Sequence, residues 1–359
     1  MAALEEAARI AVRDALSLRP GEEVLIVTNF QSDVFSIARA LFAEAKAGGG
    51  NPTLLVQGTK EPYMNIERLV NEAIRAEPHV LILLPAISSG TDAFGLQRGY
   101  LGRDGRLYRS LMYKLLEGDR RMRGFWSNRV SADTFSRCVA VDYAPMRRDA
   151  AMLKRALDRG RTVRVTSPAG TDVEFSIKGR RAYKEDGDFS LPGTGGNLPS
   201  GEVYISPAVA SAHGTIVFDG TMGLEEGDIF PAGPVRVDLR EGYISSITGG
   251  LAAARLRRAI ESSEGEALVM GLHEERRNAR HIGEFGIGLN PNAMLVGNMI
   301  EDEKALGTAH FAVGNNFEDD APALIHQDCL LLSPSIWVDG RRIMKDGELV
   351  RGGSSLNEL

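Results

Sequence analysis

Three short apolar segments, separated by stretches with helical periodicity, constrain the first half of this sequence more than any other feature. The segments cover residues 24–28, 52–57 and 80–86, and the last shows no alternation of apolar and polar residues. Apolar positions at helical spacing precede or separate them, over residues 4–18, 33–47 and 66–76. Strands buried on both faces and joined by helices are typical of a parallel sheet. The sequence therefore predicts an α/β domain with a parallel sheet over residues 1–150.

The second half has a different pattern. After a helical stretch around residue 155, short alternating strands are joined by turns that contain Asp-Gly or Glu-Gly, and one helix interrupts them at residues 251–262. Alternation with such turns is the signature of antiparallel hairpins. We therefore expect residues 151–359 to form a β-rich α+β domain.

Composition and charge exclude several functional classes. The formal net charge is -6, whereas nucleic-acid binding needs a basic surface. No run of about 18 apolar residues exists, so no membrane span is expected. The turn after the first strand lacks the glycines of a dinucleotide-binding motif. Two distant cysteines, Cys138 and Cys329, argue against a disulfide framework and favour a cytoplasmic location.

His326 and Asp328 form the clearest candidate site that the residues alone provide. They lie two apart in LIHQDCLLL, and residues two apart on a strand point to the same face. Two ionisable side chains beside an apolar run need a partner. A divalent metal is one such partner, and nitrogen with oxygen ligands favours zinc, manganese, cobalt or iron.

Three further residues are candidates, each with a structural alternative. Glu202 begins a short strand after a Pro-Ser-Gly turn, and it is also compatible with a solvated turn. His310 lies in an apolar segment and is compatible with a buried core histidine. Glu284 lies in RHIGEFGIGLNPNAM, residues 280–294, which has no clean helical or strand period. Its glycines predict either a solvated loop or a close approach of the backbone to another group.

Four segments taken together resemble a known family. GGNLPSGEVYISP, HIGEFGIGLNP, DEKALGTAHFAVGNNF and HQD, in this order, are similar to the M29 metallo-aminopeptidases, the aminopeptidase T group. The resemblance implies an α/β domain joined to a β-rich metal-binding domain, assembled as a homodimer. It also implies two divalent ions (zinc, cobalt or manganese) held by Glu202, Glu284, His310, His326 and Asp328.

One position departs from that family, and a second family is also similar. Phe317 stands where the aminopeptidases carry a tyrosine, and a phenyl ring cannot donate a hydrogen bond to an oxyanion. The 2,5-dihydroxypyridine dioxygenases share the His-x-Asp and a His-Ile-Gly stretch, here through His281 or Glu284. That resemblance implies one Fe(II), held by two histidines and one carboxylate. His281 and Phe317 are then candidates for a substrate pocket.

These observations lead to three hypotheses. The first is a metal-dependent hydrolase, an aminopeptidase acting on short peptides, with Glu284 or Glu202 handling a metal-activated water. The second is a mononuclear iron dioxygenase, or another hydrolase, that acts on a small aromatic or pyridine substrate. The third is a metal-stabilised binding protein without activity.

Overall fold

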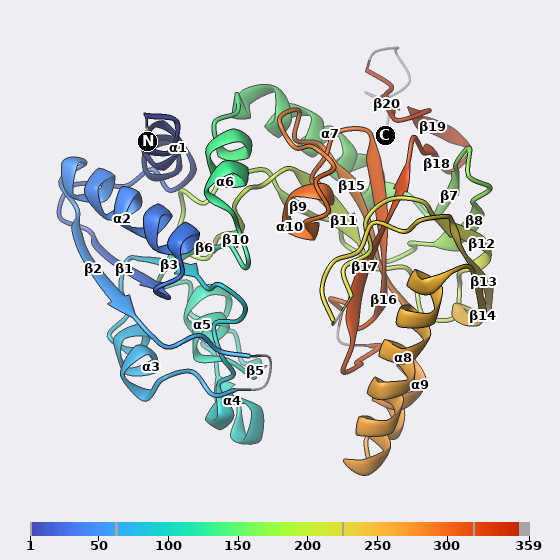
Figure 1. The fold of residues 1–359 in the computed structure, drawn as a ribbon, viewed down its shortest axis with the longest axis horizontal. Helices are drawn as coiled ribbons and strands as arrows, with labels where there is room; N and C mark the ends of the chain where they lie inside the picture. Colours follow the sequence, from blue (N-terminus) through green and yellow to red (C-terminus); the bar gives the residue numbers. More distant parts are fainter. Residues whose placement is uncertain (1, 62–63, 225, 319, 352–359) are drawn as a thin grey trace. The chain divides into compact units, whose positions relative to one another are not determined.

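The computed structural model describes residues 2–61, 64–224, 226–318 and 320–351. Its contacts group the chain into two compact units (Figure 1). Unit 1 comprises Met1–Asp142 and Gly187–Ser200, and unit 2 comprises Tyr143–Asp186 and Gly201–Leu359. The chain therefore enters unit 2, returns to unit 1 for a short segment and goes back. The expected division into domains at residue 150 stays a prediction.

Unit 1 is built on a parallel sheet with the strand order β10-β6-β3-β1-β2. Its strands are β1 (Glu23–Thr28), β2 (Asn51–Val56), β3 (Val80–Leu84), β6 (Arg123–Trp126) and β10 (Gly195–Asn197). The three predicted strands are thus confirmed to within two residues at each end. Sequence periodicity did not identify β6 or β10, because both are very short and β10 belongs to the returning segment.

Helices cover both faces of this sheet, which explains the unbroken apolar strands. The elements are α1 (Ala2–Ile10), α2 (Ser32–Ala47), α3 (Arg68–Arg75), α4 (Ala93–Arg98), α5 (Leu111–Tyr113), α6 (Ala132–Val139), the π-helical turns η1 (Ala11–Ala15) and η2 (Lys114–Gly118), and the small hairpin β4 (Tyr100–Leu101) and β5 (Leu107–Tyr108). Val24 and Ile26 pack in a core with α1, α2 and α6, whereas Leu25 and Val27 pack with α3 and α5. The predicted parallel α/β sheet is therefore confirmed.

Unit 2 contains two antiparallel sheets. The five-stranded sheet has the order β17-β16-β15-β11-β9, with β9 (Tyr183–Glu185), β11 (Glu202–Ile205), β15 (Ile282–Gly288), β16 (Thr308–Gly314) and β17 (His326–Leu332). The eight-stranded sheet has the order β14-β13-β12-β8-β7-β18-β19-β20, with β7 (Thr162–Thr166), β8 (Asp172–Ser176), β12 (His213–Phe218), β13 (Val235–Arg240), β14 (Tyr243–Thr248), β18 (Ser335–Val338), β19 (Arg341–Lys345) and β20 (Glu348–Leu349).

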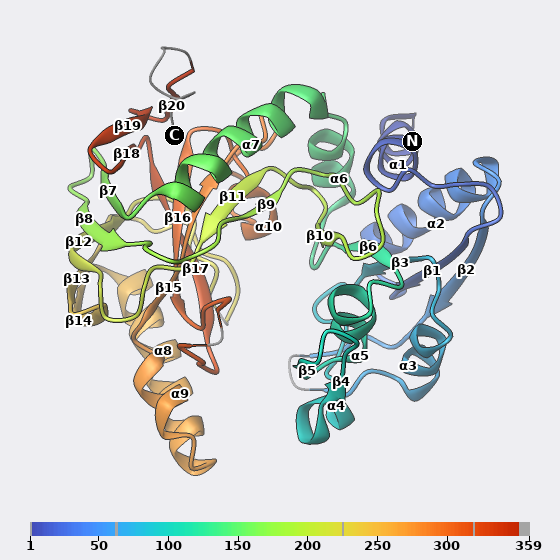
Figure 2. The ribbon, with the colours of Figure 1, turned by 180° about the vertical axis from the view of Figure 1, so that it is seen from behind.

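The helices of unit 2 are α7 (Tyr143–Arg159), α8 (Leu251–Val269), α9 (His273–Asn278) and α10 (Met299–Asp302). Helix α7 packs against β9 and β11, as Figure 2 shows from behind. The predicted helix at residues 251–262 is confirmed and extends further along the chain. Among the described helices of either unit, none is long and apolar enough to cross a membrane.

The turns of unit 2 confirm the hairpin prediction. Asp339 and Gly340 join β18 to β19 with φ of 48° and 76°, and Asp346 and Gly347 join β19 to β20 with φ of 48° and 83°. Positive φ at both central residues gives the turn whose twist matches that of paired strands. These two Asp-Gly pairs therefore mark true hairpins.

Aromatic packing decides which face of the five-stranded sheet carries the polar residues. Phe175 of β8 contacts Phe285 of β15 and Phe311 of β16, with ring centroids 5.3 Å and 5.7 Å away. Side chains alternate along a strand, so the neighbours Glu284 and His310 point to the opposite face. The two sheets thus share an apolar core, while the polar face of the smaller sheet is left for other contacts.

Candidate metal centre

The five predicted ligands lie on four neighbouring strands of the five-stranded sheet. Glu202 begins β11, Glu284 lies in β15, His310 lies in β16, and His326 and Asp328 begin β17. Strand pairing is antiparallel throughout, so residues far apart in sequence become diagonal neighbours on one face. The structure therefore brings together all five side chains singled out from the sequence.

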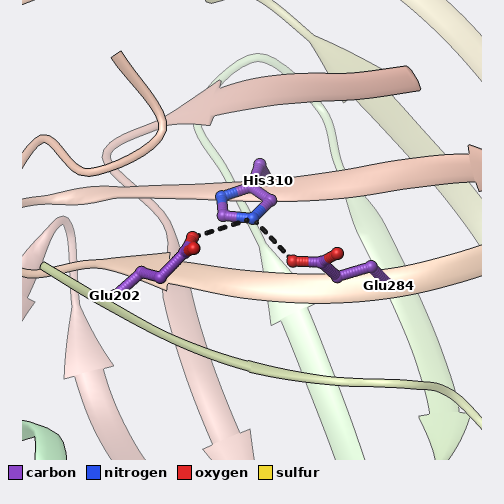
Figure 3. Close-up of side chains that lie close together, drawn as sticks. All are labelled: Glu202, Glu284 and His310. Atoms are coloured by element: carbon purple, nitrogen blue, oxygen red, sulfur yellow. Dashed lines mark hydrogen bonds and ion pairs between the residues drawn. The ribbon is translucent and has the colours of Figure 1, made fainter. Parts of the chain in front are cut away.

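His310 lies between two carboxylates, as Figure 3 shows. Its Nε2 atom is 3.1 Å from Oε1 of Glu284 and 3.4 Å from Oε2 of Glu202. All three residues are at most 4% exposed. Buried charges of this kind need a compensating partner, which a cation can supply at this end of the cluster of five side chains, called the pocket below.

His326 and Asp328 form the more accessible end of the pocket. Nε2 of His326 is 3.3 Å from Oε2 of Glu284 and 3.5 Å from Oδ1 of Asp328. On its other side, Nδ1 of His326 lies 3.0 Å from the carbonyl oxygen of Asn315. Because a carbonyl only accepts, Nδ1 carries a proton. Burial opposes a second proton, but the charges of Asp328 and Glu284 outweigh burial, raise the pKa of His326 and hold that proton on Nε2 until a metal ion replaces it. The hydrogen bond of Nδ1 is of the type that orients metal-binding histidines in many proteins.

These residues fit a divalent metal ion. Three groups have potential ligand atoms within 4.8 Å of one another: Glu202, Glu284 and His310; Glu284, His326 and Asp328; Glu303, His310 and Asp328. Among the described residues, two buried carboxylate oxygens, Oε2 of Glu202 and Oδ1 of Asp328, accept no hydrogen bond and have only the longer ion-pair contacts with His310 and His326. A cation would satisfy both of them. Mixed imidazole and carboxylate donors suit first-row transition metals.

Sequence reasoning missed three charged residues beside this pocket. Nζ of Lys304 is fully buried and lies 3.2 Å from Oε2 of Glu185 and 2.7 Å from Oε1 of Glu303, and it also donates to Glu202. Asp302, Glu303 and Lys304 do not open a helix, because α10 ends at Asp302. The charged run before His310 is a sequence signal for Glu303 and Lys304, whereas no local pattern marks Glu185.

The electrostatic environment sets the protonation of the pocket. Burial disfavours the charged ring of His310, but its hydrogen bond to Glu284 and the charge of Glu202 outweigh burial and raise its pKa to about 9. Burial also opposes the ionisation of Asp328, yet His326 lowers the pKa of Asp328 to about 2. Protons on the histidines thus balance the carboxylates, and a binding metal ion must displace them.

The glycines around Glu284 lie in close contact with other groups, which decides between the solvated loop and the close backbone approach that the sequence left open. The stretch 282–288 is a fully buried strand and not a solvated loop. A Cβ atom on Gly286 would lie 2.1 Å from Nε2 of His310, and one on Gly283 or Gly288 would lie 2.1 Å from a backbone oxygen. The expected close approach of this backbone to other groups is therefore confirmed, and it explains the missing periodicity.

We expect Gly286→Ala to weaken metal binding by at least about 10-fold, the lower bound for losing support of a metal ligand. The added methyl group overlaps the imidazole of His310, which sits in a packed site and cannot move freely. Isothermal titration of the metal-free protein with Mn(II) or Co(II) measures the effect. Gly265→Ala is the control, since a Cβ there meets nothing within 4 Å. Equal affinities of the two variants would contradict the steric argument.

The two candidate substrate-pocket residues lie in different surroundings. Phe317 is 43% exposed, and its ring centroid is 5.6 Å from that of His326 in an edge-on arrangement. His281 is buried against Tyr243, and burial lowers its pKa to about 4. His281 belongs to none of the metal-binding groups found among the described residues. The structure thus places Phe317 beside the pocket and does not bring His281 into it.

Comparison with solved structures defines the class of this fold. The chain matches 2,5-dihydroxypyridine dioxygenase from Pseudomonas putida KT2440 with a TM-score of 0.74 and 18% identity, over 98% of each chain. It matches AmpT from Thermus thermophilus with a TM-score of 0.68 and 17% identity, over 98% of this chain and 99% of that chain. At these identities the likeness concerns the fold, so the protein has the mixed α/β fold common to both.

The family match describes this protein more closely than the fold does. The model of the NicX family, described as 2,5-dihydroxypyridine 5,6-dioxygenase, matches residues 11–351, and the chain belongs to this family. A curated relative, the 2,5-dihydroxypyridine 5,6-dioxygenase of Pseudomonas putida (strain KT2440), is 26% identical over 211 residues. That match covers 54% of this chain and 55% of the relative, so it spans about half of the relative's length.

The aminopeptidase prediction is therefore wrong, together with the hydrolase and metalloprotease classes that it implied. The family match and the curated relative both lead to the dioxygenases, which were the alternative, whereas AmpT is similar in fold only. The motifs behind the prediction are pocket residues and their neighbours, which do not specify the reaction that a bound metal supports. Phe317, which lacks the O–H group of tyrosine, was the sequence feature that argued against peptide hydrolysis.

Proposed function

We propose that this protein is a metal-dependent dioxygenase that opens the ring of 2,5-dihydroxypyridine or a closely related hydroxylated aromatic compound. The observation that carries the proposal is the family match over residues 11–351, and the carboxylate–histidine pocket within that span supports it. The same proposal includes one Fe(II) ion per chain. The expected homodimer and cytoplasmic location stay predictions.

The residues suited to hold the ion are Glu284, His326 and Asp328, with His310 beside them. They supply oxygen and nitrogen donors, and His326 turns Nε2 toward the carboxylates through its contact with Asn315. Iron(II) in such a site supplies the one-electron chemistry that allows O₂ to react with an electron-rich ring. This ligand set differs from the two histidines and one carboxylate that are usual in mononuclear iron oxygenases. Each candidate metal-binding group among the described residues has one histidine and two carboxylates.

The overall reaction balances without an external reductant. Breaking the bond between C5 and C6 of 2,5-dihydroxypyridine while adding one oxygen atom of O₂ to each carbon gives a carboxylic acid at C5 and an N-formyl group at C6. The ring supplies the electrons that reduce O₂. Because His310 lies between Glu202 and Glu284, it is placed to hold or release a proton beside the ring during this change.

Ring cleavage provides a direct test. Protein loaded anaerobically with Fe(II) should consume one O₂ for each 2,5-dihydroxypyridine, abolish the ring absorbance and incorporate both atoms of ¹⁸O₂ into the product. His326→Ala should lower the rate at least about 100-fold, because even outer partners of metal ligands contribute 10- to 100-fold. The control is His213→Ala, which removes an exposed imidazole of the same unit.

Two results would overturn this function. One is an intact ring after loading with Fe(II) and with Mn(II). The other is O₂ uptake without ¹⁸O in the product, since that outcome indicates autoxidation of the substrate and not insertion of oxygen.

A further inference from the structure

Aromatic side chains form a continuous row beside the metal pocket, which we call the aromatic row: Tyr183, Tyr204 and Phe317. Tyr183 and Tyr204 are stacked, with centroids 5.4 Å apart and planes at 18°. Phe317 packs on Tyr204 at 4.9 Å, and His326 follows at 5.6 Å from Phe317. The row therefore leads directly to a residue of the proposed metal site.

Strand pairing places this row on the same face as the ligands. Tyr204 lies two residues after Glu202 on β11, so both side chains point to one side of the sheet. Tyr183 lies directly opposite Tyr204 on β9, which explains their stacking. Burial raises the pKa of the Tyr204 hydroxyl, and the negative charges of Glu185, Glu284 and Glu202 raise it further, so Tyr204 lies close enough to the pocket to feel its charges.

Phe317 is held in place although its ring is open to solvent. Its backbone N–H donates to Oγ of Ser206 at 3.2 Å, and the stacked tyrosines support one side of its ring. At 43% exposure, it is far more open than Glu284 or His310 of the adjoining pocket. The side chain of His326 is 31% exposed next to it. A fixed ring with a free surface beside a metal site is suited to contact a bound molecule.

The chemistry of that surface selects a planar aromatic ring. A phenyl group has no donor or acceptor, so it cannot bind a carboxylate, a metal or a peptide bond through hydrogen bonds. It interacts well with another aromatic ring, in offset-stacked or edge-to-face geometry with centroids about 4.5–7 Å apart. The spacing within the aromatic row already lies in this range, so one more ring would extend the same pattern.

We propose that Phe317 is a specificity-determining residue that packs against the planar ring of the substrate while the ring's polar groups face the metal pocket. This inference rests on the proposed function for its substrate class, a hydroxylated six-membered aromatic ring. It assigns to Phe317 recognition of the ring, with no part in holding the metal.

Binding without turnover tests this assignment separately from ring cleavage. Metal-loaded protein kept free of O₂ is titrated with 2,5-dihydroxypyridine and with its non-planar saturated counterpart, 5-hydroxypiperidin-2-one. Phe317→Leu should weaken binding of the aromatic compound about 3- to 10-fold, the range for one aromatic pair, and leave binding of the saturated compound unchanged. Phe317→Tyr keeps the ring and should retain the affinity. In turnover, Phe317→Leu should raise KM more than it lowers kcat.

Two controls define the alternatives. Phe230→Leu removes another exposed phenylalanine of unit 2 and should not change the affinity for either compound. The Co(II) affinity of Phe317→Leu should equal that of the wild type, because Phe317 contributes no donor. If Phe317→Leu loses the same affinity for both compounds, or loses none for either, the proposed role of Phe317 is overturned. Ring-dependent binding without any ring cleavage would instead overturn the proposed reaction and keep this assignment.

Discussion

Replacing Lys304 with methionine is expected to lower the free energy of unfolding by about 3–5 kcal/mol, the usual cost of removing one member of a buried ion pair. Its ammonium group is fully buried among the carboxylates of Glu185, Glu202 and Glu303. Methionine fills a similar volume, so the loss arises from charge and not from a cavity. Denaturant unfolding of the metal-free protein measures the difference.

The matched control for this change is Lys154→Met. Nζ of Lys154 lies 2.8 Å from Asp158 one helical turn away and donates to the carbonyl oxygen of Ala182 at 2.6 Å, and both charged side chains remain partly exposed. Its removal should cost only about 1–2 kcal/mol. Adding Glu185→Gln to Lys304→Met should restore part of the stability, since it removes one of the negative charges that Lys304 balances. Equal losses for Lys304→Met and Lys154→Met would contradict the idea that burial makes this ammonium group essential.

Glu284→Gln is expected to lower the affinity for Fe(II) or Co(II) by more than about 100-fold, since outer-shell partners of metal ligands alone contribute 10- to 100-fold. Glu284 belongs to two of the three candidate metal-binding groups, and its two oxygens contact the two histidines separately. Glutamine keeps the size of the side chain and removes its charge. Anaerobic titration of the metal-free protein, followed by metal analysis after gel filtration, gives affinity and stoichiometry.

Glu264→Gln provides the comparison for that experiment. Glu264 pairs with Arg280 at 2.6 Å in the same unit and is not a member of any candidate metal-binding group in the described part of the chain. Its affinity for metal should match that of the wild type. A Glu284→Gln protein that still binds metal within about threefold of the wild type would remove Glu284 from the proposed ligands.

The sequence was most informative where a local pattern has a single structural reading. The buried strands β1 and β3 and the Asp-Gly hairpins followed from periodicity and turn chemistry. The His-x-Asp spacing placed His326 and Asp328 on one face because strand geometry requires it. Glu202, Glu284 and His310 were separate candidates that only resemblance to a family joined to the other two, because no local rule connects residues so far apart in sequence.

Long-range pairing accounts for what the sequence did not reveal. Lys304 meets Glu185 across 119 residues, and the contact depends on the alignment of β9 with β11, which no local window encodes. The strand β15 shows no period because both of its faces are buried and glycines replace side chains. The reaction itself was misjudged, because a pocket of carboxylates and imidazoles is compatible with more than one class of chemistry.

The glycines of β15 also limit how this protein can be improved. Glycine is a poor strand former, so exchanging it for valine or threonine is normally an inexpensive way to make a sheet more rigid. Here the added side-chain atoms would clash with an imidazole ring or with a neighbouring carbonyl group. Gains in heat resistance must therefore come from elsewhere in the chain, because selection for stability alone already preserves these glycines.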